Sequence, residues 1–239
     1  MDESPRYRPL YQQVYDFLVR QIAGGEWGPG ESLPSEQALA SRLKVSQGTV
    51  RKALDALAAD SLIERRQGKG TYVAEHTAES ALFRFFRLAR PGGARAMPTS
   101  ADETLRRRRA RAAECTRLRL DTGAQVYEID RVRLIDAEPV VIERIVLPTG
   151  LFPDLERHTP LPNALYSLYQ RSYGLNIVSA EEELRADAAR ADDCRRLRLQ
   201  PGAPLLHIER VALSLEGVRV EWRVSRCDTT RLVYSVTLS

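Results

Sequence analysis

Apolar residues near the N-terminus recur at the three- and four-residue spacing of an α-helix, which places them on one side of it. This pattern predicts a helix over residues 10–23, and the glycine pair that follows ends the helix. The residues on the apolar side are Leu10, Val14, Phe17, Leu18 and Ile22. A stripe of this kind is buried in a folded protein, so the stretch predicts one helix of a small domain core.

Two shorter helices are predicted next, each preceded by a serine. Ser35 and Ser46 suit helix N-caps, because a serine hydroxyl accepts a hydrogen bond from a free amide of the first turn. A connection of about three residues joins the two helices, and this arrangement is a helix-turn-helix. The inward residues are Ala38, Leu39 and Leu43 in the first of them and Val50, Ala53, Leu54 and Leu57 in the second.

The pattern changes to two short strands after the helix-turn-helix. Residues 62–73 carry β-branched and aromatic residues on either side of a turn that contains Gly68 and Gly70. A hairpin in this place is a wing. Residues 5–75 are therefore predicted to form a winged helix-turn-helix domain.

Positive charge gathers on this domain, although the net charge of the whole chain is only +4. Between residues 42 and 71, seven Lys and Arg residues stand against three Asp and Glu residues. A local excess of this kind suits nucleic acid phosphates. A cluster of charge alone is more often an ordinary solvated surface. The positions of the individual residues are therefore needed to distinguish a DNA-binding surface from a solvated one.

The polar residues at the start of the third helix lie away from its apolar side, at the end of a recognition helix that enters the major groove. Arg51 can donate two hydrogen bonds to guanine and Gln47 suits adenine, but either could bind phosphate instead. Thr49 and Lys52 lie on the same turns. Lys69, flanked by glycines, can reach the minor groove or the DNA backbone. Taken singly, each could also be an ordinary solvated side chain.

Four separated segments of this domain resemble the GntR family of bacterial transcription regulators. They are PLYQQ at 9–13, LPSE at 33–36, VSQGTVRKAL at 45–54 and QGKGTYV at 67–73. The resemblance implies DNA contacts at Ser35, Thr49, Arg51, Gln67, Gly68 and Lys69. Gln37 and Gln47 occupy positions where family members often have arginine. This difference affects which operator bases are recognised, but not whether the domain binds DNA.

An internal repeat organises the C-terminal half of the chain. The segment CTRLRL at 115–120 recurs as CRRLRL at 194–199, an offset of 194 minus 115, or 79. Each unit predicts a helix, a glycine-containing turn and two strands, over 126–135 and 139–147 in the first and 205–215 and 218–227 in the second. Two such units form a continuous antiparallel sheet with helices on one face, so the fold class is α+β.

Charged residues interrupt the apolar faces of these predicted strands. Arg131 and Arg133 share a face of one strand, and Glu143 lies among apolar residues on the next. If one residue is deleted in the second unit, Glu221 takes the place that Glu143 holds in the first. Such charges either pair with each other across the strands or bind an anionic or zwitterionic small molecule.

This half resembles the UTRA effector domain of the HutC subfamily over roughly residues 80–237, after a linker and leading segment at 76–100. The similarity lies in RVRL at 131–134, EPVVIE at 138–143, Leu165-Tyr166 and Glu221-Trp222. It implies a chorismate-lyase-like antiparallel sheet with effector contacts at Arg131, Arg133, Glu143, Tyr166 and Glu221. Ala164 replaces a hydroxyl residue that sugar-phosphate-binding members use, which weakens the case for a sugar phosphate.

The four arginines at 106–109 could form a nucleic-acid patch, but a solvated or interface strand over Thr104 to Arg111 is favoured. Phe83, Phe85 and Phe86 indicate that part of the leading segment packs against the domain.

Several classes of protein are disfavoured. Three cysteines without CxxC spacing and three scattered histidines indicate neither a disulfide framework nor a metal site, and no cofactor is expected. The chain shows no signal peptide and no stretch of about 20 apolar residues, so a cytoplasmic protein without a membrane partner is expected.

The leading hypothesis is a homodimeric transcription regulator, in the first place a repressor, that binds double-stranded operator DNA and is controlled by a small-molecule effector. Two alternatives stay open: a chorismate-lyase-like enzyme and a small-molecule-binding protein that does not bind DNA. No nucleophile–base pair in the sequence supports the enzyme.

Overall fold

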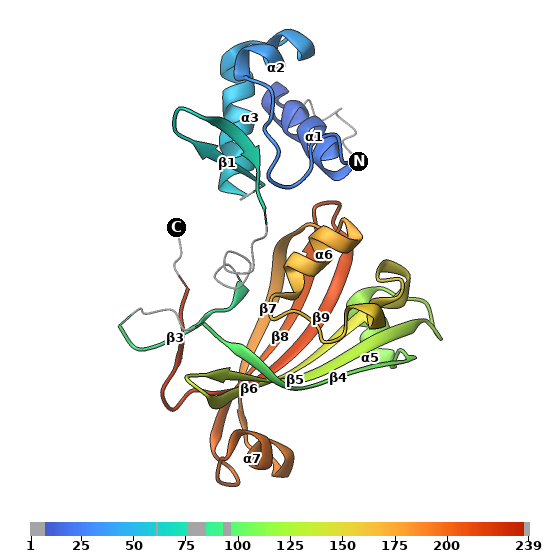
Figure 1. Cartoon of the computed structure of the whole chain (residues 1–239), viewed down its shortest axis with the longest axis vertical. Helices are drawn as coiled ribbons and strands as arrows, with labels where there is room; N and C mark the ends of the chain where they lie inside the picture. The colour runs from blue at the N-terminus through green and yellow to red at the C-terminus, as the bar shows by residue number, and fades with distance from the viewer. Residues whose placement is uncertain (1–7, 61, 76–84, 93–96, 237–239) are drawn as a thin grey trace, which may run out of the picture. The chain divides into compact units, whose positions relative to one another are not determined.

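The computed structural model describes residues 8–60, 62–75, 85–92 and 97–236, and the chain divides into two compact units (Figure 1). The first unit comprises residues 1–76 and the second residues 77–239. Phe83 and much of the predicted linker lie outside the described residues.

The N-terminal unit contains three helices and a hairpin, as the apolar pattern predicts. They are α1 (Leu10–Ala23), α2 (Glu36–Leu43), α3 (Gln47–Ala59), β1 (Ile63–Arg66) and β2 (Gly70–Val73). Ser35 Oγ accepts a hydrogen bond from the amide of Ala38 at 3.2 Å, and Ser46 Oγ accepts one from Thr49 at 3.1 Å. Both predicted N-caps are therefore confirmed.

The helices of this unit pack around a small apolar core. Leu18 of α1, Leu39 of α2 and Leu57 of α3 are fully buried. Lys44, directly after α2, has the left-handed backbone conformation that lets the chain turn into α3 within three residues. The packing holds α3 rigidly while its polar side stays accessible.

The C-terminal unit is built on one six-stranded antiparallel sheet with the strand order β4-β5-β6-β9-β8-β7 (Figure 1). The strands are β4 (Thr99–Arg109), β5 (Gln125–Ile135), β6 (Glu138–Pro148), β7 (Ile177–Ala188), β8 (Pro204–Ser214) and β9 (Arg219–Asp228). The repeat hairpins meet at the centre through β6 and β9. A short pair, β3 (Leu88–Ala89) with β10 (Val233–Tyr234), joins the start of the unit to its end.

Helices cover both faces of this sheet. The repeat helices α5 (Ala112–Leu118) and α7 (Ala191–Leu197) lie on one face, where Leu118 packs on Val146 and Leu197 packs on Ile142. The opposite face carries α6 (Leu165–Tyr173) and two 3-10 turns, η1 (Thr149–Leu151) and η2 (Leu155–His158). The expectation of helices on one face holds for the repeat helices but is wrong for α6, which lies between the two repeat units.

The two hairpins differ in length by one residue. In the first, Arg131 of β5 lies opposite Glu143 of β6; in the second, Arg210 of β8 lies opposite Arg223 of β9. The offset is thus 210 minus 131, or 79, before the turn and 223 minus 143, or 80, after it. The second turn has gained a residue rather than lost one. The prediction that Glu221 takes the place of Glu143 is therefore wrong, because Arg223 holds that place.

The arginine run forms part of β4, at the edge of the sheet, which confirms an edge strand here. Arg106 and Arg108 both donate to Glu128 of β5, and Arg108 also donates to both oxygens of Glu114 at 2.6 and 2.7 Å. Arg108 is only 18% exposed. The solvated interpretation is wrong for Arg108, which belongs to a buried ion-paired cluster.

Candidate functional site

The N-terminal unit exposes a polar surface on α3 and the tip of the hairpin. Every residue predicted to contact DNA is at least partly accessible there. Those residues are Ser35, Gln47, Thr49, Arg51, Lys52, Gln67, Gly68 and Lys69. Gly68 has a φ of 69°, a conformation that favours glycine at the tip of the tight turn.

One carboxylate organises this surface, and the sequence alone did not single it out. Glu36, the first residue of α2, accepts hydrogen bonds from Arg51 Nε at 3.0 Å and Gln47 Nε2 at 3.4 Å. Arg65 of β1 lies 3.6 Å from its other oxygen. The hydrogen bond from Arg51 lowers the pKa of Glu36 below its usual value. Glu36 therefore holds α3 side chains in place across the helix-turn-helix.

Lys52 and Lys69 differ in how they are held. The Lys52 ammonium lies 4.2 Å from the centre of the Tyr11 ring, so a cation–π contact turns it toward α1. Lys69 lies between two glycines at the exposed tip of the hairpin. Of the two, Lys69 has the greater freedom to reach a phosphate.

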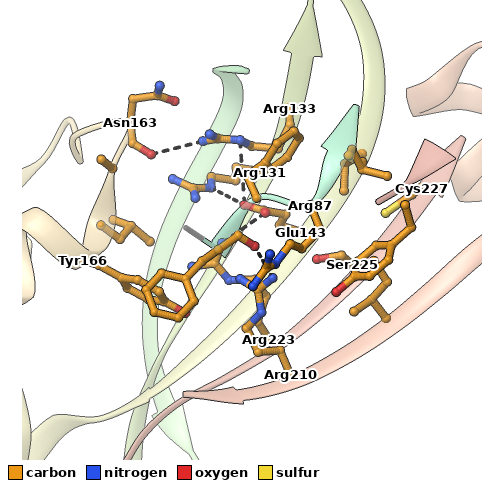
Figure 2. A pocket seen from close by; sticks show the side chains of 18 residues that line it. Arg87, Arg131, Arg133, Glu143, Asn163, Tyr166, Arg210, Arg223, Ser225 and Cys227 are labelled. Carbon is orange, nitrogen blue, oxygen red and sulfur yellow. Dashed lines mark hydrogen bonds and ion pairs between the residues drawn. The ribbon is translucent and has the colours of Figure 1, made fainter. Parts of the chain in front are cut away.

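The C-terminal unit contains a pocket on the sheet face that α6 covers. Eighteen residues line it, of which five are arginines, one is a carboxylate and eight are apolar. Arg131 and Arg133 enter from β5, Glu143 from β6, and Ser225 and Cys227 from β9 (Figure 2). The full lining is Phe85, Phe86, Arg87, Leu88, Arg131, Arg133, Val141, Glu143, Asn163, Ala164, Leu165, Tyr166, Ile208, Arg210, Arg223, Ser225, Cys227 and Tyr234.

Glu143 lies at the centre of this pocket and is held by arginines from two strands (Figure 2). Its Oε2 accepts a hydrogen bond from Arg131 Nε at 2.8 Å, and its Oε1 accepts one from Arg223 Nη1 at 3.1 Å. Burial alone would raise the pKa of Glu143, but the charges of Arg223, Arg131 and Arg133 outweigh it and hold that pKa well below its usual value. The residue is therefore a carboxylate throughout the physiological range.

Two guanidinium groups in the pocket are only partly satisfied. Arg133 Nη1 donates to Ser100 Oγ at 2.6 Å and to the Asn163 carbonyl at 3.3 Å. Within the part of the chain that the structure describes, its Nε and Arg131 Nη1 have no hydrogen-bond partner, although both side chains are almost completely buried. Burial lowers the pKa of Arg133 to about 9, which still leaves it charged at neutral pH. Buried N–H groups without a partner favour a bound anion.

Glu221 is fully buried and lies behind the pocket rather than in its lining. It accepts hydrogen bonds from Tyr166 Oη at 3.0 Å and Tyr169 Oη at 2.8 Å, and both of its oxygens bind Arg223. The structure therefore brings four of the five predicted effector residues together in the pocket wall. Glu221 supports Arg223 and Tyr166 from the layer beneath.

Comparison with known proteins identifies the same two domains. Residues 10–73 match the family model described as bacterial regulatory proteins of the gntR family, and residues 96–232 match the UTRA domain. The chain is 33% identical over 216 residues to the histidine utilization repressor of Pseudomonas putida, which covers 88% of this chain and 84% of that protein. It is 31% identical over 216 residues to the transcriptional repressor NagR of Bacillus subtilis, with 89% and 88% covered.

The chain belongs to the GntR family. Its UTRA domain, which defines the HutC subfamily, contains all but five of the pocket residues, and those five are the segment 85–88 and Tyr234. The relatives are transcription regulators, so this GntR protein is a DNA-binding regulator with an effector domain and not an enzyme.

Solved structures support the same family fold. The ligand-binding domain of a GntR-family regulator from Bordetella bronchiseptica superimposes with a TM-score of 0.60 at 31% identity, covering 64% of this chain and 96% of that one. PhnF of Mycobacterium smegmatis, at 22% identity, covers 97% of this chain with a TM-score of 0.56, and this likeness concerns the fold alone.

The sequence analysis of this GntR protein missed three arginines of the pocket, Arg87, Arg210 and Arg223. Arg210 donates to the Phe85 carbonyl and forms an ion pair with Glu182 of β7. The repeat carried a signal for it, since Arg210 is the counterpart of Arg131 at the offset of 79. Arg223 could be identified as a pocket residue only once the register of strand β9 was known.

Phe85 was expected to pack, and it does, with its ring edge-to-face against Tyr166 at 4.8 Å between centroids. Across the described ranges, no helix is long and apolar enough to cross a membrane. In the same ranges, no group of three or more His, Cys, Asp or Glu side chains is placed to hold a metal ion.

Proposed function

We propose that this GntR protein is a cytoplasmic homodimeric repressor whose operator affinity depends on an anionic or zwitterionic effector. The DNA-binding domain comprises residues 5–75 and the effector domain residues 80–237. The observation that carries the proposal is a buried arginine cluster with unsatisfied N–H groups in a domain joined to an exposed recognition helix.

The accessible polar face of α3 supports operator binding. Arg51 and Gln47 are exposed and share one acceptor, Glu36, so their side chains are ordered before DNA arrives. Ordered donors lose less conformational entropy on binding. The other proposed DNA contacts are Ser35, Thr49, Lys52, Gln67, Gly68 and Lys69.

The pocket supports effector control. Its donors are arginines, whose planar guanidinium groups bind carboxylate or phosphate in a two-pronged geometry. The proposed effector contacts are Arg131, Arg133, Glu143 and Tyr166, with Glu221 acting through Arg223 and Tyr166. Residues 85–88 also line the pocket, and they follow the sequence that connects the two domains. A ligand there can favour one arrangement of the DNA-binding domains, provided that it binds that arrangement more tightly.

The first experiment selects operator sequences from random duplexes with the full chain and without effector. We expect a near-palindrome with half-sites about one helical turn apart, bound by a dimer in light scattering. Binding should weaken by about 0.9 log units per phosphate contact for each log unit of salt. If a folded dimer enriches no sequence, the proposal is wrong, and the alternative of a small-molecule-binding protein that does not bind DNA replaces it.

A further inference from the structure

We propose that the effector is a net anion with an apolar body and no ammonium group. This inference rests on the proposed function of the pocket as an effector site. It narrows the choice between anionic and zwitterionic ligands, and it follows from the charges, donors and acceptors that the pocket presents.

The charged residues on this face of the sheet do not balance. The guanidinium groups of Arg131, Arg133, Arg210 and Arg223 are matched by four carboxylates, and these are Glu103, Glu143, Glu182 and Glu221. Arg87 of the pocket lining adds a fifth guanidinium, so in the described residues the cluster with its lining carries one more positive than negative charge. An anion entering the pocket supplies the missing negative charge, whereas a cation increases the imbalance.

The unsatisfied buried polar groups of the described pocket lining are donors. Arg131 Nη1 and Arg133 Nε are buried N–H groups for which the described residues offer no partner, and they belong to neighbouring side chains on one strand face. Figure 2 shows both guanidinium groups on the same side of Glu143. A carboxylate or phosphate oxygen bound there satisfies them.

Glu143 of the pocket lining and Glu221 beneath it are poor partners for an ammonium group. Both oxygens of Glu143 already bind arginine, and three guanidinium groups lie within 4.0 Å of it. Glu221 lies beneath the lining, with its oxygens bound by Arg223 and two tyrosines. An ammonium placed near Glu143 would meet like charges on several sides, and the cost of removing it from water would not be offset.

One part of the pocket wall is apolar. Leu88, Val141, Ile208 and Cys227 belong to one buried hydrophobic cluster, and Phe86 and Tyr234 pack against it. Burial raises the pKa of the Cys227 thiol, so this side chain stays neutral. A ligand body in contact with this wall gains by burying hydrocarbon rather than hydroxyl groups.

The test uses the full chain and three probes that share one skeleton. These are 3-phenylpropanoate, phenylalanine and 2-phenylethylamine, which carry the acid alone, the acid with an ammonium group, and the ammonium group alone. Binding is measured by calorimetry and by the shift of the melting temperature at about 10 mM probe. A series of aryl acids of increasing chain length, from benzoate to 4-phenylbutanoate, is measured in the same way, together with phenyl phosphate. The series allows for the unknown length of ligand that the pocket accepts.

We expect the acids to bind at least about tenfold more tightly than their ammonium-bearing counterparts, and the amine not to bind. Equal or tighter binding of phenylalanine overturns the inference, and so does the absence of binding by every acid in the series. Because no DNA is present, this result is independent of the operator selection, so failure of one is distinguishable from failure of the other.

A matched pair of variants locates the binding. Arg133→Gln removes a pocket charge, and Arg144→Gln removes an exposed charge on the opposite face of the adjacent strand β6. Acid affinity should fall at least about tenfold in the first variant and stay unchanged in the second. Equal effects in both would place the anion outside the pocket. If Arg133→Gln does not fold, the comparison of the three probes on the unaltered chain still tests whether the pocket prefers an acid without an ammonium group.

Discussion

The proposed DNA-binding surface and the proposed effector pocket both contain arginines, but in opposite surroundings. The Arg51 side chain is 57% exposed, whereas the Arg131 side chain is 2% exposed. Each binds a glutamate, Glu36 or Glu143, at similar distance. An exposed ion pair contributes little to stability because water competes with it, while loss of one partner from a buried pair leaves a charge that water cannot reach. The two regions should therefore respond very differently to the same kind of substitution.

The largest effect is expected from Glu143→Ala. It leaves Arg131 and Arg223 buried without their shared carboxylate, so the free energy of unfolding should fall by about 3–5 kcal/mol. Urea denaturation of the full chain measures it. Glu138→Ala, an exposed glutamate on the same strand, is the control and should change stability by less than about 0.5 kcal/mol. A loss below about 1 kcal/mol in Glu143→Ala would show that the cluster rearranges.

The same residue predicts a pH dependence. Because the pKa of Glu143 is lowered in the folded state, its carboxylate stabilises the fold above its unfolded pKa, and this contribution is lost as the pH falls toward the folded pKa. The stability difference between the unaltered chain and Glu143→Gln should therefore shrink on acidification below about pH 4. Urea midpoints at neutral and acidic pH measure it. A difference that grows with acid would contradict the prediction.

Arg51→Ala should act on DNA binding and leave stability nearly unchanged. If Arg51 contacts a guanine, operator affinity falls between about fivefold and 150-fold, and base preference relaxes at one position in each half-site. Fluorescence anisotropy with the selected operator and its single-base variants measures both. Unchanged preference combined with a smaller salt slope would reassign Arg51 to phosphate.

Glu36→Gln should also change stability little, by less than about 1 kcal/mol, because the Arg51 side of the Arg51–Glu36 ion pair is exposed to water. The substitution removes a negative charge from the proposed DNA-binding surface, so affinity for unrelated DNA should rise. Base preference should weaken, because Arg51 and Gln47 lose their shared acceptor. Stronger preference in the variant would mean that Glu36 competes with DNA for Arg51.

Local patterns predicted the DNA-binding unit almost completely. Its helices, its hairpin and the Ser35 and Ser46 caps depend on residues close together in sequence. The pocket depends on which strands are neighbours and on their register. For that reason the sequence pattern identified Arg131, Arg133 and Glu143, which lie on a single hairpin. It missed Arg223, and it placed Glu221 in the pocket lining although this residue lies beneath it. Helix α6 has no counterpart in the repeat, so the repeat could not predict it.

The extra residue in the turn between β8 and β9 has a consequence at the level of the gene. A single added codon lengthens this turn but leaves the two hairpins in the same register, because Arg210 lies opposite Arg223 just as Arg131 lies opposite Glu143. The arginine at 223 is therefore a difference in residue type and not a displacement along the strand. Insertions in the hairpin turns of this domain can thus be absorbed without changing the charge of the pocket, whereas a single substitution within β6 or β9 changes it directly.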